Sequence, residues 1–354
     1  MKMCEALASL GHEVELNYPI EGGGHKALGS DPHVYYGVHP TFSLRLIRRP
    51  SMRGARYYFA VTSALRARFR GVRLAFCRNY WAAYFCARFG ISTVFEAHAP
   101  IPDDDRVGLR LFEALIRISK FRRLFVITNS LREHYLSRFP GLKGKVDLLP
   151  DAASFVPPET EPESLGFASS TLKVGYVGQL YPGKGMELIA QLAPLCPAMS
   201  FHIVGGQEND LAYWRRECSS VSNLVFHGYV SHARVPGFIK AIDVVLLPNQ
   251  TFVAAYGNGN RNISDWTSPL KMFEYMAAGK AIVASNLPVL REVLRDGENA
   301  LLCSPAVADE WRIALERLVA DPALKDRIAS SAHAEFLQSY SWGARARKAL
   351  EIAG

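Results

Sequence analysis

One stretch in the second half of the chain combines a helix start with a lysine, a pattern suited to binding a phosphate group. It spans residues 267–285 and reads TSPLKMFEYMAAGKAIVAS. Ser268 and Pro269 are typical of a helix N-terminus, where a side-chain oxygen accepts from backbone amides that lack a partner in the helix. Lys271 lies in the first turn, and helix N-termini attract anions. Glu274 is acceptor-only when ionised and is suited to gripping two vicinal hydroxyls, such as those of a ribose.

A second stretch, residues 178–185, supplies complementary features. It reads GQLYPGKG and follows a buried strand expected at residues 172–177. Its glycines let the backbone approach a ligand closely, and Lys184 places a point charge at the start of the next helix. Each stretch alone also fits an ordinary surface helix of an α/β sheet, with a solvent-exposed lysine or carboxylate. Because ligands bind beyond the carboxyl ends of parallel strands, the two stretches together predict a diphosphate site.

Alternating strands and helices must position these stretches. Buried strands are expected at residues 172–177, 200–204, 224–226, 244–247, 281–285 and 300–303. A similar alternation runs through residues 73–149, with a helix at 130–139 that Ser130 is expected to cap. The alternation predicts parallel sheets whose faces are covered by helices. We expect an α/β protein with an N-terminal domain at residues 1–155, a linker at 156–170, a second domain at 171–340, and a C-terminal helix at 341–354 that packs back on the N-terminal domain.

The start of the chain departs from this alternation. Residues 1–10 are expected to form a helix and residues 14–18 a strand. An α/β domain ordinarily opens with a strand, so we expect that the first strand of this domain and its turn are missing ahead of Met1. The alternative is a domain that simply begins with a helix.

The net charge of +8 is unevenly placed along the chain. Residues 1–150 hold 23 Lys and Arg against 12 Asp and Glu, and no acidic residue lies between Asp31 and Glu96. We interpret the arginines of residues 45–78 as a surface for an anionic membrane or an anionic lipid-linked substrate. A merely solvated face is the alternative. No nucleic-acid-binding signature accompanies these arginines, and we expect no nucleic-acid partner.

The cysteines and the hydropathy indicate the compartment. The six cysteines are scattered without a CxxC pair, as in a reduced protein that has neither a disulfide framework nor a zinc site. No run approaches the roughly 20 apolar residues of a membrane span. We expect a cytoplasmic protein that is peripheral on the inner face of the membrane.

The second half of the chain resembles one domain of the retaining GT-B glycosyltransferases of group 4, also described as glycosyl transferases group 1. The resemblance covers residues 172–340. It rests on the segments GQLYPGKG (178–185), FHIVGG (201–206), LVFHGYVSH (224–232), DVVLLP (243–248), SPLKMFEYMAAGKAIVAS (268–285) and LREVLRDGENALLCSP (290–305). Fainter similarity to the other domain of the family lies at GHEVEL (11–16), STVFEAHAP (92–100), FVITNSLREHYL (125–136) and KVDLLPDAA (145–153).

The resemblance implies the GT-B fold, two doubly wound Rossmann-like domains that face a cleft. It also implies a nucleotide-diphosphate-sugar donor, carrying UDP or GDP, that the second domain binds without a metal or cofactor. Lys184 and the backbone of residues 269–271 would contact the diphosphate, and Glu274 the ribose. His98, on the first-domain side, would act in catalysis near the donor sugar. The implied donor-binding set is Gly178, Gln179, Lys184, Gly185, Ser268, Pro269, Leu270, Lys271 and Glu274.

Two positions depart from the family pattern. Gln179 stands where the family often has an arginine, which removes one fixed charge from the diphosphate site; Lys184, Arg261 or Lys271 would have to substitute. The family also pairs two glutamates eight residues apart, and the position eight before Glu274 is a tryptophan. Its neighbour Asp265 is the acidic residue at hand. Arg261 and Asp265 are therefore further candidates for contacts to the donor sugar or the phosphates.

The predicted function is the transfer of a sugar, with retention, to a glycan, a lipid-linked or a small-molecule acceptor. Cell-surface polysaccharide or glycoconjugate synthesis is the expected setting. The mechanism that the resemblance implies is a front-face displacement, which depends on positioning and on stabilising the leaving diphosphate. Two alternatives stay open: a non-catalytic nucleotide-sugar-binding protein or gene fragment, and a sugar-nucleotide epimerase of the same fold, whose acid and base carboxylates are not evident.

Overall fold

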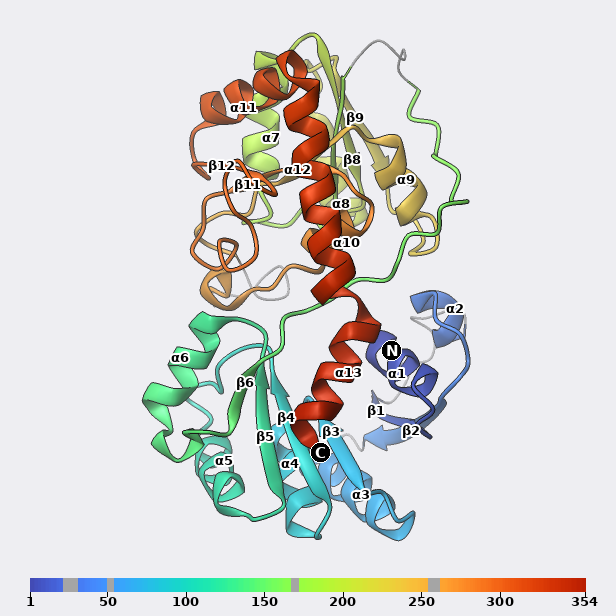
Figure 1. Ribbon diagram of the computed structural model, residues 1–354, viewed down its shortest axis with the longest axis vertical. Coiled ribbons are helices and arrows are strands. Elements are labelled where there is room, and N and C mark those ends of the chain that lie inside the picture. The colour runs from blue at the N-terminus through green and yellow to red at the C-terminus, as the bar shows by residue number, and fades with distance from the viewer. Residues whose placement is uncertain (22–30, 50–53, 167–171, 254–261) are drawn as a thin grey trace. The chain divides into compact units, whose positions relative to one another are not determined.

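The computed structural model describes residues 1–21, 31–49, 54–166, 172–253 and 262–354, and these fall into two compact units (Figure 1). Unit 1 consists of Met1–Pro150 and Trp342–Gly354, and unit 2 of Asp151–Ser341. None of the described helices is both long and apolar enough to cross a membrane.

Unit 2 is built on a six-stranded parallel sheet with the strand order β12-β11-β10-β7-β8-β9. Its strands are β7 (Leu172–Val177), β8 (Met199–Val204), β9 (Leu224–Gly228), β10 (Val244–Leu247), β11 (Ala281–Ser285) and β12 (Leu301–Cys303). Strands β7, β10 and β11 have the bounds expected from the sequence, because each contains an apolar run with at least four buried residues.

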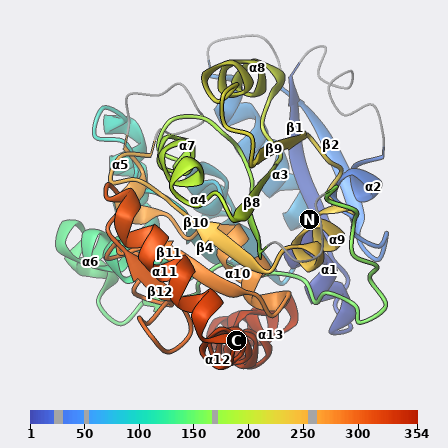
Figure 2. The ribbon, with the colours of Figure 1, turned by 90° about the horizontal axis from the view of Figure 1, so that it is seen from above.

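Helices cover both faces of this sheet, which Figure 2 shows from above. The helices are α7 (Met186–Leu195), α8 (Glu208–Glu217), α9 (Val235–Ala241), α10 (Leu270–Ala277), α11 (Ala308–Ala320) and α12 (Pro322–Glu335). On one face Val174 of β7 shares a buried cluster with Trp311 of α11. On the other face Val245 of β10 shares a cluster with Phe273 of α10. With both faces covered, the loops beyond the strand ends are the places left for a ligand.

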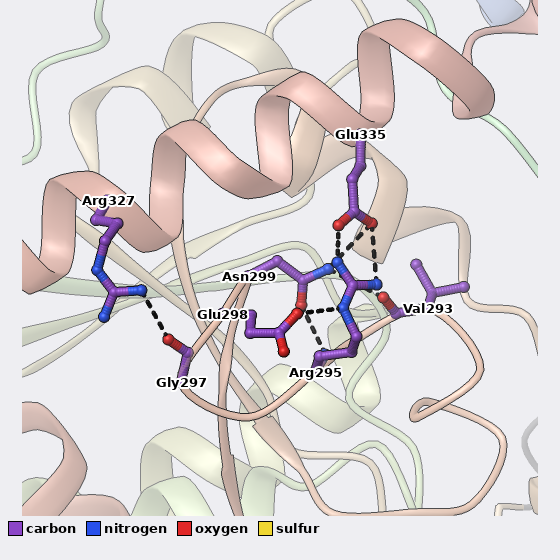
Figure 3. A network of polar contacts seen from close by, with 7 residues as sticks. All are labelled: Val293, Arg295, Gly297, Glu298, Asn299, Arg327 and Glu335. Carbon is purple, nitrogen blue, oxygen red and sulfur yellow. Dashed lines mark hydrogen bonds and ion pairs between the residues drawn. The ribbon is translucent and has the colours of Figure 1, made fainter.

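The segment between β11 and β12 is held against α12 by a polar network (Figure 3). Arg295 pairs with Glu298 and with Glu335 of α12. The buried Asn299 donates to the carbonyl of Val293 and to Glu335, and it accepts from the backbone amide of Arg295. The network gives partners to polar groups that would be costly to bury alone. Arg295, Glu298 and Asn299 of the motif at residues 290–305 therefore serve the fold of unit 2.

Unit 1 contains a four-stranded parallel sheet with the order β3-β4-β5-β6. The strands are β3 (Leu74–Cys77), β4 (Ser92–Ala97), β5 (Phe121–Val126) and β6 (Val146–Leu148), and the helices between them are α4 (Tyr80–Arg88), α5 (Arg106–Arg117) and α6 (Asn129–Arg138). Thr128 caps α6 by accepting from the amide of Leu131. The expectation that Ser130 would cap this helix was wrong, because the helix begins one residue earlier than Ser130 and Thr128 directly precedes it.

A second, two-stranded parallel sheet of unit 1 was not expected from the sequence. Strand β1 (Glu15–Glu21) pairs in register with β2 (Ser43–Arg49). Strand β2 reads SLRLIRR, and its arginines conceal the apolar alternation typical of a half-buried strand. The remaining helices of this region are α1 (Lys2–Ser9), α2 (Pro32–Tyr36) and α3 (Ala55–Phe69).

The C-terminal helix α13 (Trp342–Ala353) belongs to unit 1, although the chain reaches it only after unit 2. It packs against α1 and β5, and Figure 1 shows it beside α1. Ala349 and Ala353 lie in one buried cluster with Val94 and Phe125 of the four-stranded sheet. The last residues of the chain therefore complete the core around its first 150.

Candidate functional site

The loops that follow three neighbouring strands of unit 2 pack on one another backbone to backbone. Gly205, after β8, lies so close to Gly178, after β7, that a Cβ atom on Gly205 would be 2.4 Å from the Gly178 carbonyl oxygen. Gly185 lies even closer to the loop after β10, since a Cβ atom on it would be 2.0 Å from the Pro248 carbonyl oxygen. Both glycines have positive φ, 107° and 92°. Only glycine fits these positions, and the three loops form one compact edge.

Helix α10 begins at this edge, and Lys271 reaches back from its first turn to the strand-β7 loop. Its Nζ atom donates to the Tyr176 hydroxyl at 2.7 Å and lies 3.9 Å from the centroid of that ring. The Tyr176 hydroxyl in turn donates to the carbonyl of Gln179 at 2.6 Å. A Cβ on Gly178 would lie 3.4 Å from the Lys271 Nζ. The two stretches singled out in the sequence are therefore brought together.

The start of α10 differs in one respect from the expectation. Pro269 occupies the N-cap position, and no side chain among the described residues caps the helix by a hydrogen bond. The expectation that Ser268 would cap the helix was therefore wrong. A capping residue directly precedes the helix, and this helix begins at Leu270, two residues after Ser268. At the other end of α10, Gly279 adopts a left-handed conformation with φ 62°, as its place after the last helical residue predicts.

Two tyrosines that sequence reasoning missed hold this edge together. Besides Tyr176, the buried Tyr275 of α10 accepts a hydrogen bond from the backbone amide of Val177 at 2.9 Å. Burial raises the pKa of both hydroxyls, so both are protonated at neutral pH. Their signal in the sequence is slight, because a tyrosine at a strand end or inside an apolar helix face usually serves as a core residue.

Lys184 and Lys271 are both partly withdrawn from water. Burial lowers the pKa of Lys184, whose Nζ lies 5.1 Å from the centroid of the Tyr181 ring. Burial, and then the charge of Lys184, lower the pKa of Lys271 well below its usual range, while Glu274 acts in the opposite direction. The two lysines and the carboxylate are thus close enough to influence one another's charge. Such a pair of desolvated cations is suited to an anion that carries more than one negative charge.

The loop after β10 holds a buried polar atom without a partner. Asn249 is 1% exposed, and its Oδ1 makes no hydrogen bond to any residue that the structure describes. Asp265 lies in the short turn Ser264–Trp266, is exposed, and accepts from the Ser264 hydroxyl at 3.3 Å. The candidate Arg261 lies outside the described residues.

The candidate histidine of unit 1 follows strand β4 and is bound to a buried carboxylate. Its Nε2 lies 2.6 Å from Oε1 of Glu96, whose side chain is 4% exposed. The other carboxylate oxygen, Oε2, accepts from Arg345 of α13 at 2.8 Å. Glu96 was not singled out in the sequence, although its place two residues before His98 puts both on one side of an extended chain. Arg345 could not be found there, because it is far away in the sequence.

The carboxylate of Glu96 is ionised despite its burial. Burial raises the pKa of Glu96, but Arg345, His98 and Arg78 act against it and lower the pKa to about 2. Arg78 contributes from 3.5 Å. At neutral pH Glu96 is therefore an acceptor only, in hydrogen bonds with Arg345 and His98, while Arg78 pairs with it as a charge.

Residues 171–321 match a family model described as Glycosyl transferases group 1. A 2-deoxystreptamine N-acetyl-D-glucosaminyltransferase of Streptomyces fradiae is 27% identical over 169 residues, which are 43% of this chain and 40% of that protein. A phosphatidyl-myo-inositol mannosyltransferase of Mycobacterium leprae is 29% identical over 202 residues, which are 54% of this chain and 48% of that protein. The matched region thus spans less than half the length of these curated relatives.

A solved structure supports the architecture over nearly the whole chain. HepE of Anabaena in complex with UDP superposes with a TM-score of 0.70 at 15% identity, covering 99% of this chain and 94% of that chain. At this identity the likeness shows a shared fold, the GT-B fold with parallel sheets in α/β units. The fold class predicted from the sequence is therefore confirmed.

Proposed function

We propose, because residues 171–321 match the model of the glycosyl transferases group 1 family, that this protein is a glycosyltransferase. It moves a sugar from a nucleotide-diphosphate-sugar to a glycan, a lipid-linked or a small-molecule acceptor, in the synthesis of a cell-surface polysaccharide or glycoconjugate. The observation that carries the proposal is that Lys271 packs against the loop at Gly178. Lys184 lies close enough to affect the pKa of Lys271, so two desolvated lysines lie at the same strand edge.

The donor diphosphate binds Lys184, Lys271 and the backbone of residues 269–271. The charge of the phosphates offsets the cost of holding two lysines away from water. Glu274, on the same helix as Lys271, accepts from the ribose hydroxyls. HepE has been solved with UDP and with UDP-glucose, which makes a UDP-sugar the first donor to test and a GDP-sugar the second.

Transfer proceeds with retention and without a metal, by front-face displacement. The acceptor oxygen forms its bond to the anomeric carbon while the bond from that carbon to the phosphate oxygen breaks. The acceptor proton passes to the departing phosphate oxygen, and His98 contacts the transferred sugar. The protein contributes positioning and stabilises the charge of the leaving diphosphate.

A membrane surface is the proposed setting, with the protein peripheral on the cytoplasmic face. The supporting observation is the end of α3 together with the turn that follows it: Phe69, the last residue of this helix, is 85% exposed. Arg68, Arg70 and Arg73, which lie near Phe69 in the sequence, are exposed as well. Arginines with an exposed apolar residue between them are suited to anionic headgroups over an acyl layer. The acceptor is then a lipid-linked glycan or lipid at that surface.

The activity is tested with a panel of UDP- and GDP-sugars by measuring nucleotide release and sugar transfer. We expect Lys184→Ala and Glu274→Ala each to lower transfer at least tenfold, about 1.4 kcal/mol of transition-state stabilisation. Lys348→Ala, at an exposed lysine of α13, is the matched control and should match the wild type. Full activity of either site variant at limiting donor would refute the site. If the protein binds nucleotide but turns over no donor, the non-catalytic nucleotide-sugar-binding alternative replaces the proposed activity.

A further inference from the structure

The loop that follows β10 is bound to the loop of residues 178–185. The backbone amide of Gln250 donates to the carbonyl of Gly183 at 3.0 Å, and the Gln250 side chain donates to the carbonyl of Pro248 at 2.9 Å. Asn249 lies between Pro248 and Gln250. Because both of its neighbours are fixed by these contacts, Asn249 is held in place at the strand edge of the candidate donor site.

The alternation of side chains along β10 shows on which face of the sheet Asn249 lies. Leu246 shares a buried cluster with residues of α7, and Leu247 shares one with residues of α10. Pro248 continues the alternation past the end of the strand, because a Cβ on Gly185, the N-cap residue of α7, would lie 2.7 Å from the Cβ of Pro248. Asn249, the next residue, therefore falls on the face that α10 covers.

The carboxamide of Asn249 is buried there with an unused acceptor. The residue is 1% exposed, and its Oδ1 has no hydrogen-bond partner in the described part of the chain. Burying a polar atom without a partner costs free energy, and native structures give nearly all such atoms one. The oxygens of an ionised phosphate are acceptors themselves and cannot serve. A hydroxyl can, and because it both donates and accepts it suits either orientation of the carboxamide.

We propose that Asn249 binds a hydroxyl group of the nucleotide-sugar and is a specificity-determining residue of the donor site. The inference rests on the proposed function, in which Lys184 and Lys271 bind the diphosphate. The ribose lies on one side of that diphosphate and the transferred sugar on the other, and both offer hydroxyls. Bound donor then supplies the partner that Oδ1 lacks. Loss of the carboxamide should consequently weaken donor binding without destabilising the protein.

The variant Asn249→Leu separates these two effects, because leucine resembles asparagine in shape and has no polar side-chain atom. Calorimetric titration with UDP, UDP-glucose, GDP and GDP-mannose measures the affinity, and thermal unfolding without ligand measures the stability. We expect the ligands that the wild type binds through this hydroxyl to bind the variant roughly three- to tenfold more weakly, the effect of one lost hydrogen bond. The Tm should equal or exceed that of the wild type.

Ser63→Ala is the matched control. Ser63 of α3 is also buried, and its Oγ has no hydrogen-bond partner among the residues that the structure describes. Because it belongs to unit 1, away from the strand edge of unit 2, its loss tests only the removal of an unpartnered polar atom. The Tm of Ser63→Ala should likewise equal or exceed that of the wild type, and its affinity for every ligand should be unchanged.

Comparison of the ligands assigns the hydroxyl. Equal weakening for a nucleotide and its nucleotide-sugar places the contact at the ribose, and weakening for the nucleotide-sugar alone places it at the transferred sugar. Asn249→Ala repeats the measurement if the larger leucine prevents folding. Unchanged affinity for all ligands, or a Tm lowered in both variants, overturns the proposal. A wild type that binds none of the four ligands refutes the proposed function as well, whereas equal binding by wild type and variant refutes this inference alone.

Discussion

At the scale of single residues, burial lowers the pKa of both lysines at the strand edge of unit 2, Lys184 and Lys271. Lys271 lies over the ring of Tyr176 and donates to its hydroxyl, at 2.7 Å. Lys184 adds a like charge nearby. Taking a cation out of water disfavours the charged form, and a second cation adds to the effect. The proton on Lys271 is therefore held less firmly than on an ordinary lysine, and an anion at the site would restore it.

We therefore predict that nucleotide binding takes up protons. Below the lowered pKa of Lys271 the lysine is already charged and the affinity is fully present. As the pH rises through that pKa, binding must recruit a proton, and the affinity falls until the pH passes the higher pKa of the complex. Calorimetry of UDP binding between pH 7 and 10, in two buffers of different ionisation enthalpy, measures the uptake. Lys271→Met should abolish it, and a wild-type uptake of zero throughout this range would contradict the prediction.

At the scale of elements, strands β8 and β9 carry a pair of histidines inside unit 2. His202 Nδ1 lies 3.1 Å from His227 Nε2, and the two rings are stacked with centroids 5.3 Å apart. Burial, followed by the charges of His227 and Lys173, lowers the pKa of His202 to about 4. Burial lowers the pKa of His227 as well. Inside the sheet both rings are therefore shifted toward their neutral forms.

Unit 2 should accordingly lose stability in mild acid. Since the pKa of His202 is lower in the folded than in the unfolded chain, its contribution is fully present above about pH 6.5. It is lost as the pH falls toward 4, and a shift of this size corresponds to about 3 kcal/mol. Hydrogen exchange of peptides from β8 and β9 reports it. His202→Gln should flatten the pH dependence and the exposed His12→Gln should not; equal slopes in all three proteins would argue against the pair.

The turn between α3 and β3 is the element proposed to meet a membrane. Helix α3 packs on α4, with the rings of Tyr57 and Trp81 4.3 Å apart, and leaves Phe69 exposed at its end. We predict that Phe69→Ser lowers co-sedimentation with anionic vesicles several-fold and that salt weakens the binding of the wild type. Ile313→Ser, at an exposed residue of α11, should have no effect. Binding that is insensitive to salt and to lipid charge would sink the proposed surface.

Elements of the second unit were easier to predict than those of the first, for a physical reason. Strands β7, β10 and β11 are short apolar runs bounded by turn residues, so local pattern fixes their bounds. Strand β2 was not predicted because arginines interrupt its apolar pattern. Helix α2 was not predicted because it is only a single short turn. In the site, Lys184 and Lys271 belong to local motifs. The pairing of Glu96 with Arg345 depends on the tertiary fold, which no local pattern encodes.

At the scale of the whole molecule, the chain runs from unit 1 into unit 2 and returns. Residues 342–354 contribute Ala349 and Ala353 to the core of unit 1 and Arg345 to its buried carboxylate. Removing one partner of a buried ion pair costs about 3–5 kcal/mol, because an uncompensated charge is left behind. The fold of unit 1 is thus coupled to a segment that is remote from it in the sequence.

We predict that a chain ending at Ser341 loses the fold of unit 1 and keeps that of unit 2. Peptides from β4 and β5 should exchange their amide hydrogens rapidly in the shortened protein, while those from β7 and β10 stay protected. The full-length Arg347→Ala variant, at an exposed residue of α13, is the control and should protect both units. Protection of β4 and β5 in the shortened chain would show that unit 1 does not depend on α13.

The return of α13 has a consequence for synthesis on the ribosome. Domains generally fold as units while the chain emerges, the N-terminal one first. Here we expect the reverse order, because the first 150 residues emerge early but share their core with a helix that follows all of unit 2. Until Arg345 arrives, Glu96 lacks its buried partner and the nascent unit 1 remains incomplete. Unit 2 has its described strands in one continuous segment, so we expect it to finish folding before unit 1, whose first residues are synthesised earliest.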